Sequence, residues 1–242
     1  MGNNREVAIY SFDIFDTVLT RIVADPTDIF LLMESEFKRS DLQLPDELID
    51  RFKPIRIKAE SDARELSRSE DINIRDIYKQ IGKLYGLNEE KISEMINIEI
   101  NTEYRSIYPI CSTVSHINQL REKGARIIFI SDMYLPVGNL RDMMTKVGVY
   151  QEGDDLYVSS EIGFTKASGN LFRHVLEQEK CEPYQMCHCG NNLYSDVYVP
   201  AKMGICIYRT SDDELRKLLR QSSLYVTKRR AFGFLHSLFF KH

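Results

Sequence analysis

Short apolar runs alternate with stretches of helical periodicity, and this alternation constrains the fold more than any other feature of the chain. Five mainly apolar runs stand out, residues 7–12, 125–130, 156–158, 185–189 and 204–208. A short, continuously apolar run is typical of a strand that is buried on both faces. Strands that alternate with helices form a parallel sheet with right-handed crossovers. We therefore expect an α/β fold, with a Rossmann-like parallel sheet of about five strands flanked by helices.

The interval 21–108 contains no convincing strand and predicts a helical insert between the first strand and the rest of the sheet. Asp25-Pro26, Pro45, Asn73 and Asn88 are typical helix starts, and Gly86 is a typical helix end. Apolar residues recur at helical spacing within it: Phe30, Met33 and Phe37; Leu48, Phe52, Ile55 and Ala59; Ile74, Ile77, Tyr78, Ile81 and Tyr85; Ile92, Met95, Ile96 and Ile100. These groups predict four amphipathic helices. The expected domains are a sheet core of residues 1–20 and 109–223, a helical insert of 21–108 and a helical extension of 224–242.

Composition narrows the class of protein. The 242 residues carry a formal net charge of −4, which argues against nucleic-acid binding. The five cysteines are an odd number without disulfide-like spacing, which favours reduced thiols and a cytoplasmic protein. No apolar run reaches the roughly 18 residues of a membrane-spanning helix.

Polar side chains follow several of the predicted strands. Asp13, Asp16 and Thr17 follow the first strand, and Ser131 and Asp132 follow the second. Lys166 lies in a loop after the third strand, and Asn191 and Asp196 follow the fourth. Ligands of open α/β sheets bind beyond the carboxyl ends of the strands, so these residues are expected to converge on one site. Each also has a simpler explanation, as a helix cap for the carboxylates or as a solvated loop residue for the lysine.

Four sequence motifs, taken in chain order, resemble the four motifs of the haloacid dehalogenase (HAD) superfamily. They are Asp13-Ile14-Phe15-Asp16-Thr17, Ile130-Ser131-Asp132, Thr165-Lys166 and Gly190-Asn191-Asn192-Leu193-Tyr194-Ser195-Asp196. The resemblance covers about residues 7 to 210 and implies a Rossmann-like core with a helical cap. Residues 12–17, 131–135 and 159–161 are similar to one subgroup in particular, the predicted hydrolases found with bacterial glycosyltransferases of surface-polysaccharide synthesis.

The resemblance implies a magnesium-dependent hydrolase that acts on a small phosphoester, such as a sugar phosphate. Asp13 would attack phosphorus and form an aspartyl-phosphate, Ser131 would bind phosphoryl oxygens and Lys166 would offset their charge. Mg²⁺ would lie among Asp13, the Phe15 carbonyl, Asn191 and Asp196. Thr17 and Asp132 complete the expected substrate contacts.

Two residues depart from the pattern of phosphatases in this superfamily. Phe15 stands where most of them have a second Asp that serves as general acid and base, and Asp16, one residue later, is the candidate to replace it. Asn191 stands where they usually have an Asp, which removes one negative charge from the metal site. These departures leave two alternatives open: a catalytically weakened domain that binds a phosphorylated ligand or a partner glycosyltransferase, and a 2-haloacid dehalogenase.

Two further sets of residues are candidates for binding. Basic residues of the insert could contact phosphate or a sugar acid, although a solvated helix face explains each more simply: Arg56, Lys58, Arg64, Arg68 and Arg75. In the extension 224–242, Phe232, Leu235 and Phe239 recur at helical spacing beside basic residues. This helix is expected either to pack on the core or to dock on a partner protein or a membrane surface.

Overall fold

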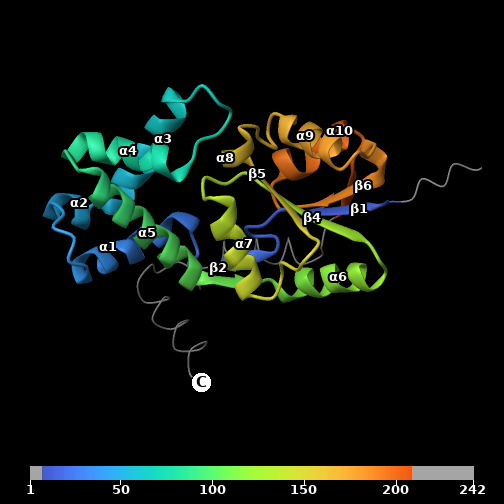
Figure 1. Cartoon of the computed structure of the whole chain (residues 1–242), viewed down its shortest axis with the longest axis horizontal. Coiled ribbons are helices and arrows are strands. Elements are labelled where there is room, and N and C mark those ends of the chain that lie inside the picture. The colour runs from blue at the N-terminus through green and yellow to red at the C-terminus, as the bar shows by residue number, and fades with distance from the viewer. Residues whose placement is uncertain (1–6, 209–242) are drawn as a thin grey trace, which may run out of the picture. The chain divides into compact units, whose positions relative to one another are not determined.

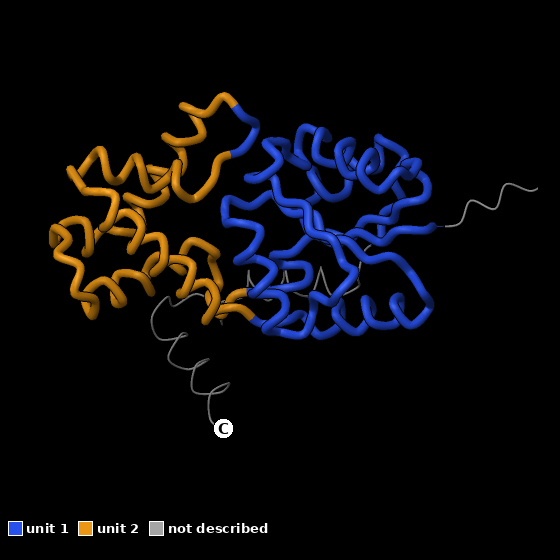
Figure 2. The backbone as a smooth tube through the Cα atoms, in the orientation of Figure 1, with its two compact units in different colours: residues 1–20, 69–71, 108–215 blue, residues 21–68, 72–107, 216–242 orange. Residues whose placement is uncertain are grey.

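The computed structural model describes residues 7–208, which form two compact units (Figure 2). One unit contains residues 7–20, 69–71 and 108–208, and the other contains residues 21–68 and 72–107. Four residues of the predicted insert 21–108, Ser69–Asp71 and Tyr108, thus belong to the sheet unit. The predicted extension 224–242 lies outside the described residues, so packing or docking of that helix stays a prediction.

The first unit is built on a five-stranded sheet with the order β5-β4-β1-β6-β7 (Figure 1). Each neighbouring pair is parallel. The strands are β1 (Ile9–Phe12), β4 (Arg126–Ser131), β5 (Asp155–Val158), β6 (Met186–Cys189) and β7 (Cys206–Tyr208). The five predicted strands and the parallel α/β sheet are therefore confirmed, with β1 at the centre.

The alternation of side chains along the strands gives each face of the sheet its own helical layer. On one face, Ile9 and Ile128 pack with Phe172 and Val175 of α9 (Asn170–Gln178). On the other face, Phe12 meets Phe129 and His116, the last from α6 (Cys111–Glu122). The three inner strands, β1, β4 and β6, are buried on both faces, which explains why they are mainly apolar.

The sheet unit also contains short connecting elements. They are α7 (Val137–Lys146), α8 (Ser159–Ile162), η2 (Pro183–Gln185), η3 (Leu193–Tyr198) and α10 (Val199–Lys202). Two three-residue strands, β2 (Leu19–Arg21) and β3 (Ile107–Pro109), pair with each other where the chain leaves this unit and where it returns. Three residues are too few for a periodic pattern, so the sequence does not predict these two strands. The five cysteines, all within the described residues, form no disulfide.

The second unit is helical, as expected. Its elements are η1 (Pro26–Asp28), α1 (Ile29–Arg39), α2 (Asp46–Asp50), α3 (Phe52–Leu66), α4 (Ile74–Tyr85) and α5 (Glu89–Ser106). The predicted caps are confirmed: Asn73 forms a capping box with Asp76, Asn88 accepts a hydrogen bond from the Lys91 amide, and Gly86 ends α4 in the left-handed conformation.

One predicted helix proves to be two. The helix expected to begin at Pro45 and to include Leu48, Phe52, Ile55 and Ala59 is interrupted at Arg51, between α2 and α3. Pro54 explains the break, because in a continuous helix its ring would clash with the carbonyl of Asp50 and its nitrogen could not donate to that carbonyl.

A buried ion-pair network lies inside the helical unit. The Arg56 guanidinium, which is fully buried, donates two hydrogen bonds of 2.8 Å to the Glu99 carboxylate. Tyr78 Oη donates to the same carboxylate at 2.6 Å, and the guanidinium lies 4.7 Å from the centre of the Phe30 ring. The expectation that Arg56 contacts a phosphate or sugar acid is therefore wrong, because its charge is already paired and shielded from solvent.

Removing this arginine should weaken the helical unit strongly, because Glu99 would remain as a buried charge. We expect Arg56→Ala to lower the free energy of unfolding by about 3–5 kcal/mol in urea titrations followed by circular dichroism. Arg75→Ala is the control, because Arg75 pairs with Glu89 through half-exposed side chains and its loss should cost far less. Equal losses in the two variants would contradict a stabilising role for the buried pair.

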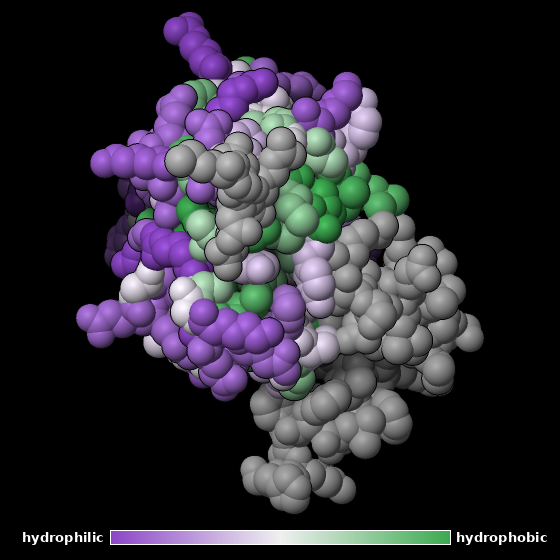
Figure 3. All heavy atoms as spheres, turned by 90° about the vertical axis from the view of Figure 1, so that its right-hand side faces the viewer, coloured by the Kyte–Doolittle hydropathy of each residue, from purple (hydrophilic) through white to green (hydrophobic). Residues whose placement is uncertain are grey.

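Within residues 7–208, no helix has the length and apolar character needed to cross a membrane. On the face drawn in Figure 3, hydrophilic side chains (purple) cover much of the described surface and hydrophobic ones (green) gather in a limited area near the middle.

Candidate active site

The candidate site lies at the carboxyl end of β1, where Asp13 directly follows the strand. The Asp13 amide donates to the Cys189 carbonyl at 2.8 Å, which extends the pairing of β1 with β6 by one bond. On the other side, Phe12 pairs with Phe129 of β4, so Ser131 at the end of β4 lies near the same level of the sheet. Asp13 and Ser131 are both buried. The central strand and its neighbours therefore bring these residues to one edge of the sheet.

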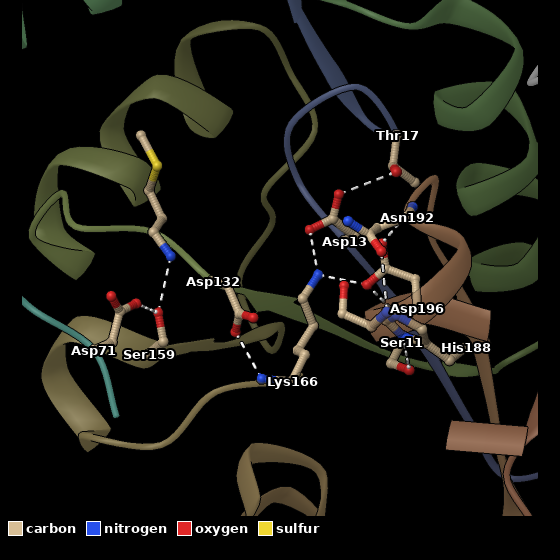
Figure 4. Close-up of polar contacts among 12 residues, drawn as sticks. Ser11, Asp13, Thr17, Asp71, Asp132, Ser159, Lys166, His188, Asn192 and Asp196 are labelled. Carbon is tan, nitrogen blue, oxygen red and sulfur yellow. Dashed lines mark hydrogen bonds and ion pairs between the residues drawn. The ribbon is translucent and has the colours of Figure 1, made fainter. Parts of the chain in front are cut away.

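Lys166 joins two carboxylates that are far apart in the sequence. Its Nζ donates to Asp13 Oδ1 and to Asp196 Oδ1, each at 2.6 Å (Figure 4). Asp13 Oδ2 also accepts a hydrogen bond from Thr17 Oγ1 at 3.1 Å. All four side chains are buried, so these charges interact with little screening by water.

The three charges perturb one another strongly. Burial raises the pKa of Asp13 to about 7, although the Lys166 ammonium acts in the opposite direction. Burial would likewise raise the pKa of Asp196, but the charge of Lys166 overcomes it and holds that pKa well below the usual range. Burial acts to lower the pKa of Lys166, and the carboxylates of Asp13 and Asp196 outweigh it and raise that pKa. Lys166 therefore stays cationic, and Asp196 stays ionised.

Asp196 is held by the loop that follows β6. Its Oδ2 accepts a hydrogen bond from the Asn192 amide at 2.9 Å, and the Asn192 side chain accepts from the amides of Tyr194 and Ser195 at the start of η3. A Cβ added to Gly190 would lie 2.4 Å from Asp196 Cγ. Only glycine at position 190 leaves room for this carboxylate.

A buried histidine, which the sequence does not mark as a site residue, lies beside the same carboxylate. His188 Nδ1 lies 2.8 Å from Ser11 Oγ, and Nε2 lies 3.4 Å from Asp196 Oδ1. Burial lowers the pKa of His188, so the ring is expected to be neutral. Ser11 and His188 face each other in the register of β1 and β6, a pairing that no local sequence pattern reveals.

The remaining predicted residues occupy the loops around this edge. Asp132 accepts a hydrogen bond from the Lys166 amide at 2.8 Å, which makes it a support of the Lys166 loop. Asp16 adopts a φ of 64°, in the left-handed region where aspartate is tolerated. Its Oδ1 accepts a hydrogen bond from Thr20 Oγ1 at 3.5 Å. Phe15 forms an isolated bridge with Leu19, and Asn191 is exposed.

These residues can offer a metal only a small set of ligands. Within residues 7–208 there is no cluster of three or more His, Cys, Asp or Glu side chains that could hold a metal ion. Magnesium usually binds proteins through one or two carboxylates and completes its shell with water and substrate phosphate. The two carboxylates that meet at Lys166 fit that requirement.

The sequence matches no family model and no curated protein. Solved structures nevertheless share its fold. A 2-haloacid dehalogenase from Pseudomonas syringae pv. Tomato DC3000 has a TM-score of 0.60 at 12% identity, over 83% of this chain and 85% of its own. The putative HAD-hydrolase YfnB from Bacillus subtilis, bound to magnesium, has a TM-score of 0.57 at 16% identity, over 88% and 99%.

The HAD family enzyme bt-2542 from Bacteroides thetaiotaomicron has a TM-score of 0.56 at 13% identity, over 85% of this chain and 94% of its own. A mutant of bt-2542 was crystallised in complex with magnesium and inorganic phosphate. At these identities the comparison establishes the fold. This chain has the fold of the haloacid dehalogenase superfamily, in which the solved neighbours include both dehalogenases and other HAD hydrolases.

The close approach of Asp196 to Gly190 can be tested by adding a side chain at position 190. Gly190→Ala should displace Asp196 and lower the free energy of unfolding by about 1–3 kcal/mol, because the added methyl group overlaps a buried carboxylate. Gly138→Ala in α7 is the matched control: nothing lies within 4 Å of the added Cβ, and the change should raise stability by about 0.4–1 kcal/mol. Urea unfolding of both variants measures the difference. A neutral Gly190→Ala would contradict the close approach of Asp196.

Proposed function

We propose that this chain is a magnesium-dependent phosphohydrolase that cleaves a small phosphoester through an aspartyl-phosphate on Asp13. The observation that carries the proposal is the Lys166 ammonium, held 2.6 Å from both Asp13 and Asp196 at the carboxyl edge of the sheet. A buried carboxylate with a cation against one oxygen is suited to approach an anionic phosphoryl group.

The chain's own residues account for the chemistry as follows. Thr17 and Lys166 each hold one oxygen of Asp13 and so fix the carboxylate that attacks phosphorus. The bond from phosphorus to the leaving oxygen breaks, and the phosphoryl group is transferred to Asp13. Water then attacks the phosphorus, the bond to Asp13 breaks and inorganic phosphate leaves. Ser131, buried at the end of β4, is proposed to donate to a phosphoryl oxygen.

Asp13 and Asp196, the Phe15 carbonyl and Asn191 are the residues proposed to hold Mg²⁺. The ion would stabilise charge on the phosphoryl oxygens. Support comes from the donor set, in which two carboxylates share a single ammonium, and from the magnesium in the YfnB and bt-2542 structures. Asn191 contributes an oxygen without a charge, so magnesium is expected to bind weakly.

Protonation of the leaving group is the step expected to limit the rate of this reaction. A general acid typically contributes about 10²–10⁴-fold, and Phe15 cannot supply a proton. Asp16 is the proposed substitute, since it follows Phe15 in the same loop and is only partly buried. We infer that the enzyme is slow with poor leaving groups and faster with activated aryl phosphates such as p-nitrophenyl phosphate, whose phenolate leaves readily without a proton.

The proposed substrate class and biological role rest on the sequences of three loops. Residues 12–17, 131–135 and 159–161 are similar to hydrolases found with glycosyltransferases, which favours a sugar phosphate, a role in surface-polysaccharide synthesis in the cytoplasm and a glycosyltransferase as partner. A panel of phosphorylated sugars tests the substrate class.

One observation favours a second function, 2-haloacid dehalogenation. Dehalogenating members of the superfamily carry an aromatic residue at the place of Phe15. Turnover of p-nitrophenyl phosphate with and without Mg²⁺, measured beside chloride release from 2-chloropropionate, separates the two activities. If the protein shows neither activity but still binds a phosphosugar, the result would favour a domain that only binds its ligand.

Replacing the nucleophile should abolish hydrolysis and leave the fold intact. We expect Asp13→Asn to lower kcat for the aryl phosphate by more than about 10⁴-fold, because an amide does not form the acyl-phosphate. Circular dichroism and thermal melting check the fold, and Asp142→Asn, an exposed change on α7, is the control. Normal turnover by folded Asp13→Asn would exclude this mechanism.

Restoring a carboxylate in the fourth motif should strengthen the metal site. Asn191→Asp adds a negative charge to an oxygen-ligand set, so we expect magnesium to bind about tenfold more tightly in calorimetric titrations of both proteins. Position 191 is exposed, so the change should leave stability unaffected. Equal or weaker binding would mean that the metal does not lie at this loop.

A further inference from the structure

The loop that carries Lys166 is bound by a carboxylate from a distant part of the sequence, Glu70. Glu70 Oε2 accepts hydrogen bonds from the Thr165 amide at 2.8 Å, from Thr165 Oγ1 at 3.3 Å and from Ser168 Oγ at 2.6 Å. Its Oε1 accepts from Asn170 Nδ2. The Glu70 amide donates in turn to the Gly163 carbonyl at 3.3 Å. One residue thus binds the loop at several points along residues 163–170.

The residue that follows Glu70 supports the neighbouring loop. Asp71 Oδ2 accepts a hydrogen bond from Ser159 Oγ, and Ser159 Oγ accepts one from the Met133 amide at 2.9 Å (Figure 4). These contacts reach the loop after β4, which contains Asp132. Since Asp132 accepts a hydrogen bond from the Lys166 amide, the two loops are also tied to each other.

This network determines where the Lys166 backbone lies. The amides of Thr165 and Lys166 are consecutive, and each donates to a carboxylate, the first to Glu70 and the second to Asp132. A lysine side chain is flexible, so its ammonium can be aimed at two carboxylates with little reorganisation only if its Cα is fixed. Hydrogen bonds from Ser168, Thr165 and Asn170 outweigh the effect of burial and lower the pKa of Glu70, so it is ionised near neutral pH.

We propose that Glu70 is a positioning residue for Lys166, and that it acts through the loop 163–170. This inference rests on the proposed phosphohydrolase function for its effect on catalysis. Glu70 itself is exposed, so its replacement leaves no buried unpaired group and should cost little stability. A residue that served stability alone, for example by capping α9, would have the opposite signature.

The test compares Glu70→Gln with the wild-type protein. Glutamine keeps one acceptor oxygen and has lost the charge, so it cannot accept the same set of hydrogen bonds. We expect kcat for p-nitrophenyl phosphate to fall about 10- to 100-fold, KM to change less than about threefold and the melting temperature to stay within a few degrees. Hydrogen exchange at the amides of Thr165 and Lys166 should accelerate. Glu90→Gln, an exposed carboxylate on α5, is the control and should change none of these.

Ser168→Ala tests the same role of Glu70 if Glu70→Gln misfolds. Ser168→Ala removes one donor to Glu70, together with the bonds of Ser168 Oγ to the Thr165 carbonyl and the Asn170 amide. It should give a smaller change in the same direction, and its effect should shrink when it is combined with Glu70→Gln. Unchanged exchange at Thr165 and Lys166 overturns the proposal, as does faster exchange with unchanged kcat. If the wild-type protein hydrolyses no phosphoester, the proposed function fails. The positioning role is then decided by exchange at these amides alone.

Discussion

One ammonium group shared by two buried carboxylates holds the candidate site together. Without Lys166, Asp13 and Asp196 would repel each other in surroundings that screen charge poorly. Several features of the fold serve this contact: the end of β1, the room that Gly190 leaves for Asp196 and the hydrogen bond from the Asn192 amide. When both carboxylates are ionised, their two negative charges and the one positive charge of Lys166 leave the group with a net charge of −1. An anionic substrate therefore needs a further cation, which is the electrostatic reason for proposing magnesium there.

The loops around the site are braced by carboxylates that are themselves not proposed to react. Asp132 and Glu70 accept the amides of Lys166 and Thr165, while Asp71 reaches Met133 through Ser159. Glu70 and Asp71 lie in sequence between two stretches of the helical unit, yet they belong to the sheet unit. Glu70 and Asp71, which lie within the predicted insert 21–108, thus help to hold the loops that bind phosphate in the proposed mechanism.

Much of the fold was predictable because its signals are local. Continuous apolar runs mark strands buried on both faces, and the capping residues Asn73 and Asn88 mark helix starts that the structure confirms. The convergence of Asp13, Lys166 and Asp196 followed from the geometry of parallel sheets, although their chemical roles remain predictions. What the sequence did not reveal depends on register or on long-range pairing. Ser11 meets His188 only because β1 lies beside β6, and Arg56 is buried only because Glu99 lies opposite it. The break at Arg51, by contrast, could have been inferred from Pro54.

The central position of β1 has a consequence for how the chain folds during synthesis. β1 is the first strand made, but its two neighbours, β4 and β6, begin only at Arg126 and Met186. At the 5–20 residues per second of a translating ribosome, the roughly 110 residues between β1 and β4 take about 6–23 s to appear. The helical insert is complete before then and can form its own core, whereas the apolar β1 has no partner strand in the sheet. The nascent chain therefore depends on β4 and β6, which are synthesised late, to cover its earliest strand. Until they appear, β1 is the segment that a chaperone would have most reason to protect.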